Sequence, residues 1–110
     1  MGAPRPCKEV HKRYRDLATA CKEPGRQSQD AGPLGETRRE LVKLGISVGA
    51  RLEGAVHAHT RLALERGASP DQVLHVASLA GATLGPLARM AVHGWIREAI
   101  ETSASPSARR

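Results

Sequence analysis

The sequence predicts an all-α protein, and three observations support this fold class. Apolar residues recur every three or four positions in several segments, as in Leu41, Leu44 and Val48, which is the spacing of one helix face. The run Ser69-Pro70-Asp71-Gln72 is typical of a helix start, with Ser at the N-cap, Pro at the first helical position and Gln completing a capping box. Third, the chain has no Phe, one Trp and one Tyr, so its core consists of Leu, Val, Ile and Ala. Small aliphatic side chains favour close helix packing.

The N-terminal part, residues 1–35, is expected to be an arm with one amphipathic helix and a linker. Its first residues are rich in Pro and Gly, and the apolar spacing predicts a helix from Glu9 to Cys21. Residues 22–35 are dense in Pro, Gly, Ser, Gln and Asp, which is the composition of a linker.

The remainder divides into a helical core, residues 36–101, and a tail, residues 102–110, with the composition of a disordered end. Gly67 suits the left-handed conformation that closes a helix, and Gly81 to Gly85 are expected to interrupt another. The expected core helices run from about Glu36 to Gly49, from Leu52 to Gly67, from Pro70 to about Ala80, and from Pro86 onward.

The net charge of +6 raises the question of nucleic-acid binding, so the position of the charge matters. Residues 31–101 hold eight Lys or Arg against seven Asp or Glu, so the excess lies in the arm and the tail. Because the core lacks a basic stripe and aromatic platforms for bases, we expect no nucleic-acid partner. No apolar run has membrane-spanning length and no signal peptide is evident, so we expect a cytoplasmic protein without a membrane partner. Cys7 and Cys21 are fourteen apart, which fits free thiols better than a metal or dithiol site.

Glu40 is the most informative acidic residue, because the helix expected around it is apolar over most of its circumference. A carboxylate on such a helix needs a partner, since an unpaired buried charge costs several kcal/mol. Two interpretations stay open from the spacing alone. Glu40 forms a salt bridge to Lys43 or Arg39, or it acts as a functional acid.

The next expected helix carries two histidines, and they point in different directions. His59 shares a face with Leu52, Ala55 and Arg66, whereas His57 shares one with Glu53. Glu53 and His57 are possible secondary site residues that offer two metal ligands, but the sequence identifies no third, so a surface ion pair is expected and no metal. His75, on the following helix, is interpreted as a packing or interface residue.

The spacing from Glu40 to His59 carries a family resemblance. Eleven residues separate Glu40 from Leu52, two separate Leu52 from Ala55, and three separate Ala55 from His59. This resembles the carboxymuconolactone decarboxylase and alkylhydroperoxidase D family, whose redox members carry Glu-x11-Cys-x2-Cys-x3-His. The resemblance covers about residues 33–100. It implies an alkylhydroperoxidase D-like helical bundle that assembles as a homo-oligomer, a trimer or a hexamer.

Both cysteine positions of the redox members are apolar here, at Leu52 and Ala55. Peroxide reduction of that type needs a thiolate and a resolving thiol, so a family-type peroxiredoxin or alkylhydroperoxidase activity is ranked last. The decarboxylase branch has no such requirement. By resemblance to that branch, we expect a lyase-like acid–base enzyme that acts on a small carboxylated substrate without a cofactor.

In this hypothesis His59 is the proton donor and Glu40 its orienting partner. Arg51 or Arg61 would anchor the substrate carboxylate, and Leu52 and Ala55 would line the substrate site. The alternative is a non-catalytic oligomeric binding module that kept the scaffold and lost the dithiol.

Overall fold

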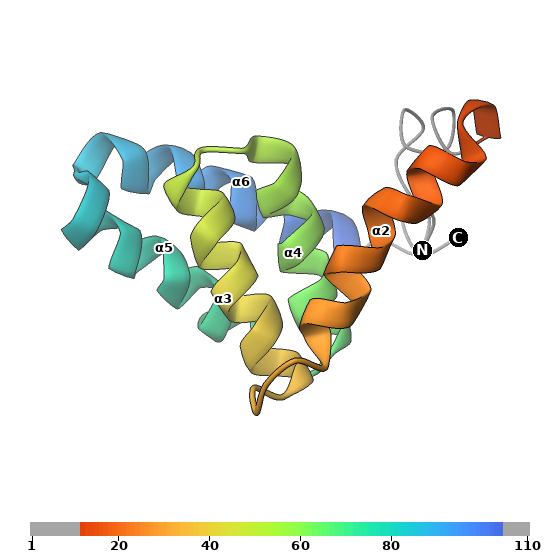
Figure 1. The fold of residues 1–110 in the computed structure, drawn as a ribbon. Coiled ribbons are helices and arrows are strands. Elements are labelled where there is room, and N and C mark those ends of the chain that lie inside the picture. The colour runs from red at the N-terminus through yellow and green to blue at the C-terminus, as the bar shows by residue number, and fades with distance from the viewer. Residues whose placement is uncertain (1–11, 105–110) are drawn as a thin grey trace. The chain divides into compact units, whose positions relative to one another are not determined.

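The structure, a computed structural model, describes residues 12–104, and this part of the chain is helical without any β-strand. The all-α prediction is therefore confirmed for the described residues. Figure 1 shows the helices along the chain. They are α2 (Arg15–Gln29), α3 (Glu36–Gly49), α4 (Glu53–Glu65), α5 (Pro70–Leu84) and α6 (Pro86–Ala104).

The described chain falls into two units, residues 12–34 and residues 35–104. The first unit consists of α2 and the turn that follows it. Its helix ends at Gln29, so residues 22–29, expected to be linker, are helical and that expectation is wrong. Residues 9–11 of the expected helix lie outside the described residues.

Side-chain contacts span Pro24, which lies inside α2. The Arg26 guanidinium lies 2.6 Å from a carboxylate oxygen of Glu23, and the Gln27 amide donates a second hydrogen bond to the same oxygen. The Arg26 bond, with a smaller contribution from Gln27, lowers the pKa of the Glu23 carboxyl. Such pairs at three- and four-residue spacing stabilise a helix surface.

The second unit is built from two helical hairpins (Figure 1). Helix α3 packs against α4 and α5 packs against α6, and further contacts of α4 with α6 and of α3 with α5 join the hairpins. Buried aliphatic residues from all four helices, and Ala68 between α4 and α5, form the core: Leu44, Val48, Val56, Ala63, Ala68, Val73, Ala77, Ala80, Val92 and Ile96.

The turn from α3 to α4 is short because α3 ends in a Schellman motif. The Leu52 amide donates to the carbonyl of Ser47 and the Arg51 amide to that of Val48. This motif places the residue after the C-cap in the left-handed region, and that residue is Arg51, with φ 56°. Glycine is the usual residue at such a position, so Arg51 holds its conformation against a steric cost.

The end of α4 repeats the motif with the expected glycine. Gly67 has φ 102°, its amide donates to Leu64, and the Ala68 amide donates to Ala63. The chain then enters α5 through the predicted capping box. The Gln72 amide donates to the Ser69 hydroxyl at 3.1 Å, and the Ser69 amide donates to the Gln72 side chain at 2.9 Å. Both predictions, the glycine closure and the capping box, are confirmed.

The break between α5 and α6 is narrower than the sequence suggested. Residues 81–84 belong to α5, and Gly85 alone, with φ 102°, separates the helices. Packing explains why residue 81 is a glycine, because a Cβ at this position would overlap the side chain of Arg89 on α6.

Helix α6 extends through Ala104, so residues 102–104 are helical and the tail expectation fails for them. Residues 105–110 lie outside the described part. The buried side of α6 consists of Ala88, Val92, Ile96 and Ala99, whereas Leu87 and Met90 are exposed. The spacing of apolar residues predicted this helix, but it did not predict which of those residues face inward.

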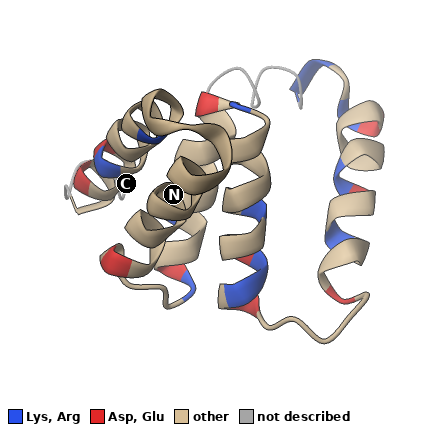
Figure 2. Ribbon diagram, turned by 90° about the vertical axis from the view of Figure 1, so that its left-hand side faces the viewer, with Lys and Arg blue, Asp and Glu red and all other residues tan. Residues whose placement is uncertain are grey.

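Charged residues of both signs occur on the same helices of the second unit (Figure 2). Helix α5 is the exception, because Asp71 is its single charged residue. Among the described residues, every helix is too short or too polar to cross a membrane.

Candidate active site

Glu40 lies inside the second unit, although it is a charged residue. It is located on the face of α3 that also carries Leu44, Ser47 and Val48, and its exposed fraction is 1%. This face packs against α4. The expectation that Glu40 is buried and needs partners is therefore met by its position in the fold.

His59 supplies one of those partners from α4. Its Nδ1 lies 2.9 Å from Oε2 of Glu40. Because a carboxylate only accepts, Nδ1 carries the proton and donates it, which fixes the tautomer of the neutral ring. The opposite nitrogen, Nε2, makes no hydrogen bond to any residue that the structure describes, and a quarter of the side chain is exposed. The ring is therefore held at Nδ1, and Nε2 is the nitrogen that does not contact Glu40.

Arg66, the C-cap residue of α4, supplies the second partner. Its guanidinium forms an ion pair with Oε1 of Glu40, the carboxylate oxygen that His59 does not use. The main chain of Arg66 is also held, because the Thr37 hydroxyl at the start of α3 donates to its carbonyl oxygen. Thr37 and Glu40, three apart on one helix face, thus fix both the backbone and the side chain of Arg66.

Lys43 completes the surroundings of the carboxylate at a longer distance. Its Nζ lies 3.8 Å from Oε1 of Glu40, and about a third of its side chain is exposed. Of the two interpretations that the spacing left open, neither excludes the other here. Glu40 pairs with Lys43, more closely with Arg66, and also orients His59. Pairing with cations is what allows a carboxylate to stay buried.

The other residues assigned to the site lie elsewhere on the hairpin. Arg51 and Leu52 form the α3 to α4 turn, where both are exposed. Ala55 is half-buried one helical turn before His59, on the same face of α4, and Arg61 is half-buried two residues after it. Neither arginine is among the ion-pair partners of Glu40 in the described part of the chain.

Glu53 and His57 lie away from Glu40, on the face of α4 that meets α6. His57 Nε2 is 3.5 Å from a carboxylate oxygen of Glu98. The carboxylate that lies within ion-pair distance of His57 is therefore that of Glu98, on α6, and not that of Glu53 as the spacing suggested.

An apolar groove of about 510 Å³ lies between α3 and α5, on a different side of α3 from Glu40. Its polar groups are few and include His75. The groove is lined by Leu41, Val42, Gly45, Val48, Gly49, Gln72, His75, Val76, Leu79, Ala80, Thr83 and Leu84. Val42 and Leu79 are about half exposed, so α3, which is apolar over most of its circumference, leaves one apolar side open.

These observations define an all-α protein whose helical hairpin holds a buried carboxylate, an imidazole and a guanidinium in contact. The model of the Carboxymuconolactone decarboxylase family matches residues 9–104, and the chain belongs to this family. The match extends beyond the segment 33–100 that carried the resemblance and includes α2. No curated protein and no solved structure matches the chain.

Sequence reasoning missed two residues that the structure adds. Arg66 shares the helix face of His59, seven residues on, and this spacing is the signal in the sequence for its contact with Glu40. Glu98 had no comparable signal, because its approach to His57 depends on how α6 packs against α4.

Proposed function

We propose that this chain is an acid–base enzyme of the lyase type, acting on a small carboxylated substrate with His59 as proton donor. The observation that carries the proposal is the 2.9 Å hydrogen bond from His59 Nδ1 to the buried carboxylate of Glu40. An imidazole held at one nitrogen by a carboxylate presents the other in a defined direction, as general acids and bases require.

The chemistry follows from the protonation of the ring. Loss of carbon dioxide from an unsaturated carboxylated lactone breaks a carbon–carbon bond and leaves the electron pair on an enolate-like carbon. An imidazolium donates its Nε2 proton to that carbon, and Glu40 stabilises the ring while it is charged. The neutral ring then regains a proton from water. The overall reaction needs no redox partner.

The substrate carboxylate requires a cation near His59. Arg51 and Arg61 were the expected anchors, and Lys43 is a further candidate because it is partly exposed beside Glu40. Arg66 is less suited, since Glu40 already occupies its guanidinium.

A second candidate function is a non-catalytic oligomeric binding module, and the groove between α3 and α5 favours it. A concave apolar surface with few polar groups is typical of a small-molecule site, and half-exposed Val42 and Leu79 are the kind of residues that oligomer contacts cover. In this proposal Arg66 and Glu40 form a structural ion pair, and assembly as a trimer or hexamer would bury the groove. Peroxidase activity ranks below both, because Leu52 and Ala55 carry no sulfur.

The test compares His59→Gln with His93→Gln, a matched change at an exposed histidine on α6. Decarboxylation of unsaturated carboxylated lactones is followed by carbon dioxide release, and thermal stability is measured with and without each lactone. The proposal expects turnover in the wild type and in His93→Gln, with a loss of about 10²–10⁴-fold in His59→Gln.

Thermal stabilisation by the lactone that depends on His59, together with turnover, supports the enzyme. Absence of turnover from a panel of such acids, with stabilisation only by apolar ligands and unaffected by His59→Gln, would favour the binding module.

A further inference from the structure

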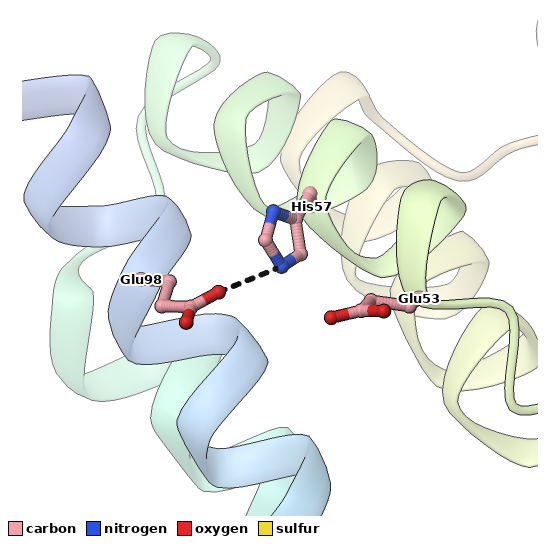
Figure 3. Close-up of side chains that lie close together, drawn as sticks. All are labelled: Glu53, His57 and Glu98. Carbon is pink, nitrogen blue, oxygen red and sulfur yellow. Dashed lines mark ion pairs between the residues drawn. The ribbon is translucent and has the colours of Figure 1, made fainter.

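We propose that Glu53, His57 and Glu98 form a binding site for a divalent transition-metal ion, with Zn²⁺ as the representative ion, that joins α4 to α6. Figure 3 shows the three side chains converging from the two helices. Each offers one ligand atom, and the three atoms all lie within 4.8 Å of one another. This site is separate from the Glu40 and His59 pair, because His57 and His59 project from different faces of α4.

The helix geometry explains the convergence. Glu53 and His57 are four residues apart, so their side chains occupy one face of α4 a single turn apart. That face meets α6, from which Glu98 reaches toward the imidazole. Two helices therefore supply the ligands, which makes the set a cross-link between secondary-structure elements.

The His57 imidazole provides a second, independent observation that points to a ligand at this position. Its Nε2 is shielded from solvent and has no hydrogen-bond partner among the described residues. The Glu98 oxygen at 3.5 Å is too distant and misaligned for a hydrogen bond. Burial of a polar atom without a partner is unfavourable, and a metal ion on the Nε2 lone pair would remove that cost.

The donor set matches a particular class of ion. One imidazole nitrogen and two carboxylate oxygens suit Zn²⁺ and its first-row neighbours better than Mg²⁺ or Ca²⁺, which prefer oxygen ligands alone. The two carboxylates also balance the charge of a divalent ion.

The distances allow binding after small side-chain movements. An ion about 2.0–2.2 Å from each donor needs donor atoms roughly 3–3.7 Å apart. The His57 to Glu98 separation of 3.5 Å already falls in this range. Glu53 and Glu98 are exposed side chains, so they are free to rotate inward by the remaining distance of about 1 Å. Solvent would supply the remaining coordination positions.

The test uses the full chain in a Cys7→Ser/Cys21→Ser background, because thiols would otherwise bind the same ion. Metal-free protein is titrated with ZnCl₂ by calorimetry, and its melting temperature is measured with Zn²⁺ and with Mg²⁺. We expect one Zn²⁺ per chain and a rise in melting temperature that Mg²⁺ does not reproduce.

Matched variants separate the site from adventitious surface binding. His57→Gln and Glu98→Gln should each weaken Zn²⁺ binding at least ten-fold. His93→Gln and Glu101→Gln, which change an exposed histidine and an exposed carboxylate of α6, should leave it unaltered. Circular dichroism checks that every variant remains helical.

Glu98→His distinguishes a metal site from a simple ion pair between His57 and Glu98. A second imidazole is a good zinc ligand, so this variant should retain Zn²⁺ binding although it removes the ion pair. The proposal is overturned if the wild type binds no Zn²⁺, if His57→Gln and Glu98→Gln bind as well as the controls, or if Glu98→His loses binding as completely as Glu98→Gln.

Discussion

Thr37 at the start of α3 donates a hydrogen bond from its hydroxyl to the main-chain carbonyl of Arg66, the residue that caps α4. This bond joins the two ends of the hairpin that lie farthest from the α3 to α4 turn. It also places the Arg66 side chain where it reaches Glu40. The site therefore depends on a contact made by a residue that has no role in the chemistry.

Replacing Thr37 with valine removes this hydrogen bond while keeping the shape of the side chain. We expect Thr37→Val to lower the free energy of unfolding by about 1 kcal/mol. Thr83→Val is the control, since the Thr83 hydroxyl bonds only within its own helix at an exposed position. Urea denaturation of both variants measures the difference, and equal effects would show that the bond to Arg66 contributes nothing specific.

Arg66 should contribute more to stability than any other cation around Glu40. Arg66→Met leaves the carboxylate buried with only the distant Lys43 and the His59 ring, and breaking a buried pair in this way costs about 3–5 kcal/mol. Lys43→Met should cost less than about 1 kcal/mol, because the Lys43 ammonium lies 3.8 Å from Glu40 and makes no hydrogen bond to it.

Equilibrium unfolding measures whether Arg66 contributes more to the free energy of unfolding than Lys43 does. The double change Glu40→Gln/Arg66→Met should recover part of the loss, because it removes both charges together. If the double variant is as unstable as the sum of the single changes, Arg66 and Glu40 are not coupled.

A substitution of Arg51 is expected to raise the stability of the protein and to weaken substrate binding. Because its φ is 56°, Arg51→Gly relieves a left-handed conformation and should raise the free energy of unfolding by about 1 kcal/mol. If Arg51 also anchors the substrate carboxylate, the same change should raise KM. Arg51→Lys serves as the comparison, because it keeps the positive charge and the strained backbone. A variant that is more stable and fully active would remove Arg51 from the list of anchors.

Cysteines can be placed at the two apolar positions at the start of α4, where the redox members of the family carry their dithiol. Leu52 is the N-cap residue of α4 and Ala55 lies in its first turn, where partly positive backbone amides favour a thiolate. Peroxide turnover of the natural sequence should be at background and unaffected by alkylation of Cys7 and Cys21. Leu52→Cys/Ala55→Cys should introduce alkylation-sensitive peroxide reduction, measured with a dithiol reductant.

In that background His59→Ala should reduce the new activity by about 10²–10⁴-fold, provided that the Glu40 and His59 pair assists proton transfer. Leu52→Ser/Ala55→Ser is the matched control without sulfur. A disulfide that forms between the new cysteines without any peroxide turnover would instead support the non-catalytic function.

Features that depend on neighbouring residues could be predicted from the sequence. The capping box at Ser69 and the glycine closure at Gly67 each follow from spacings of a few residues, and the family resemblance implied the pairing of Glu40 with His59. Composition was a poorer guide, because residues 22–29 are helical although their composition suggested a linker. A local rule succeeds where the partner lies within a few helical turns.

Only the tertiary structure decided what depends on the packing of separate helices. Glu98 reaches His57 because α6 crosses α4 at that level, and Arg66 reaches Glu40 because the ends of α3 and α4 are tied together. The open side of α3 that forms the groove has the same cause, since α5 covers one apolar face and leaves the next exposed. Helical periodicity states which residues share a face, but the identity of the opposing surface depends on how the whole chain packs.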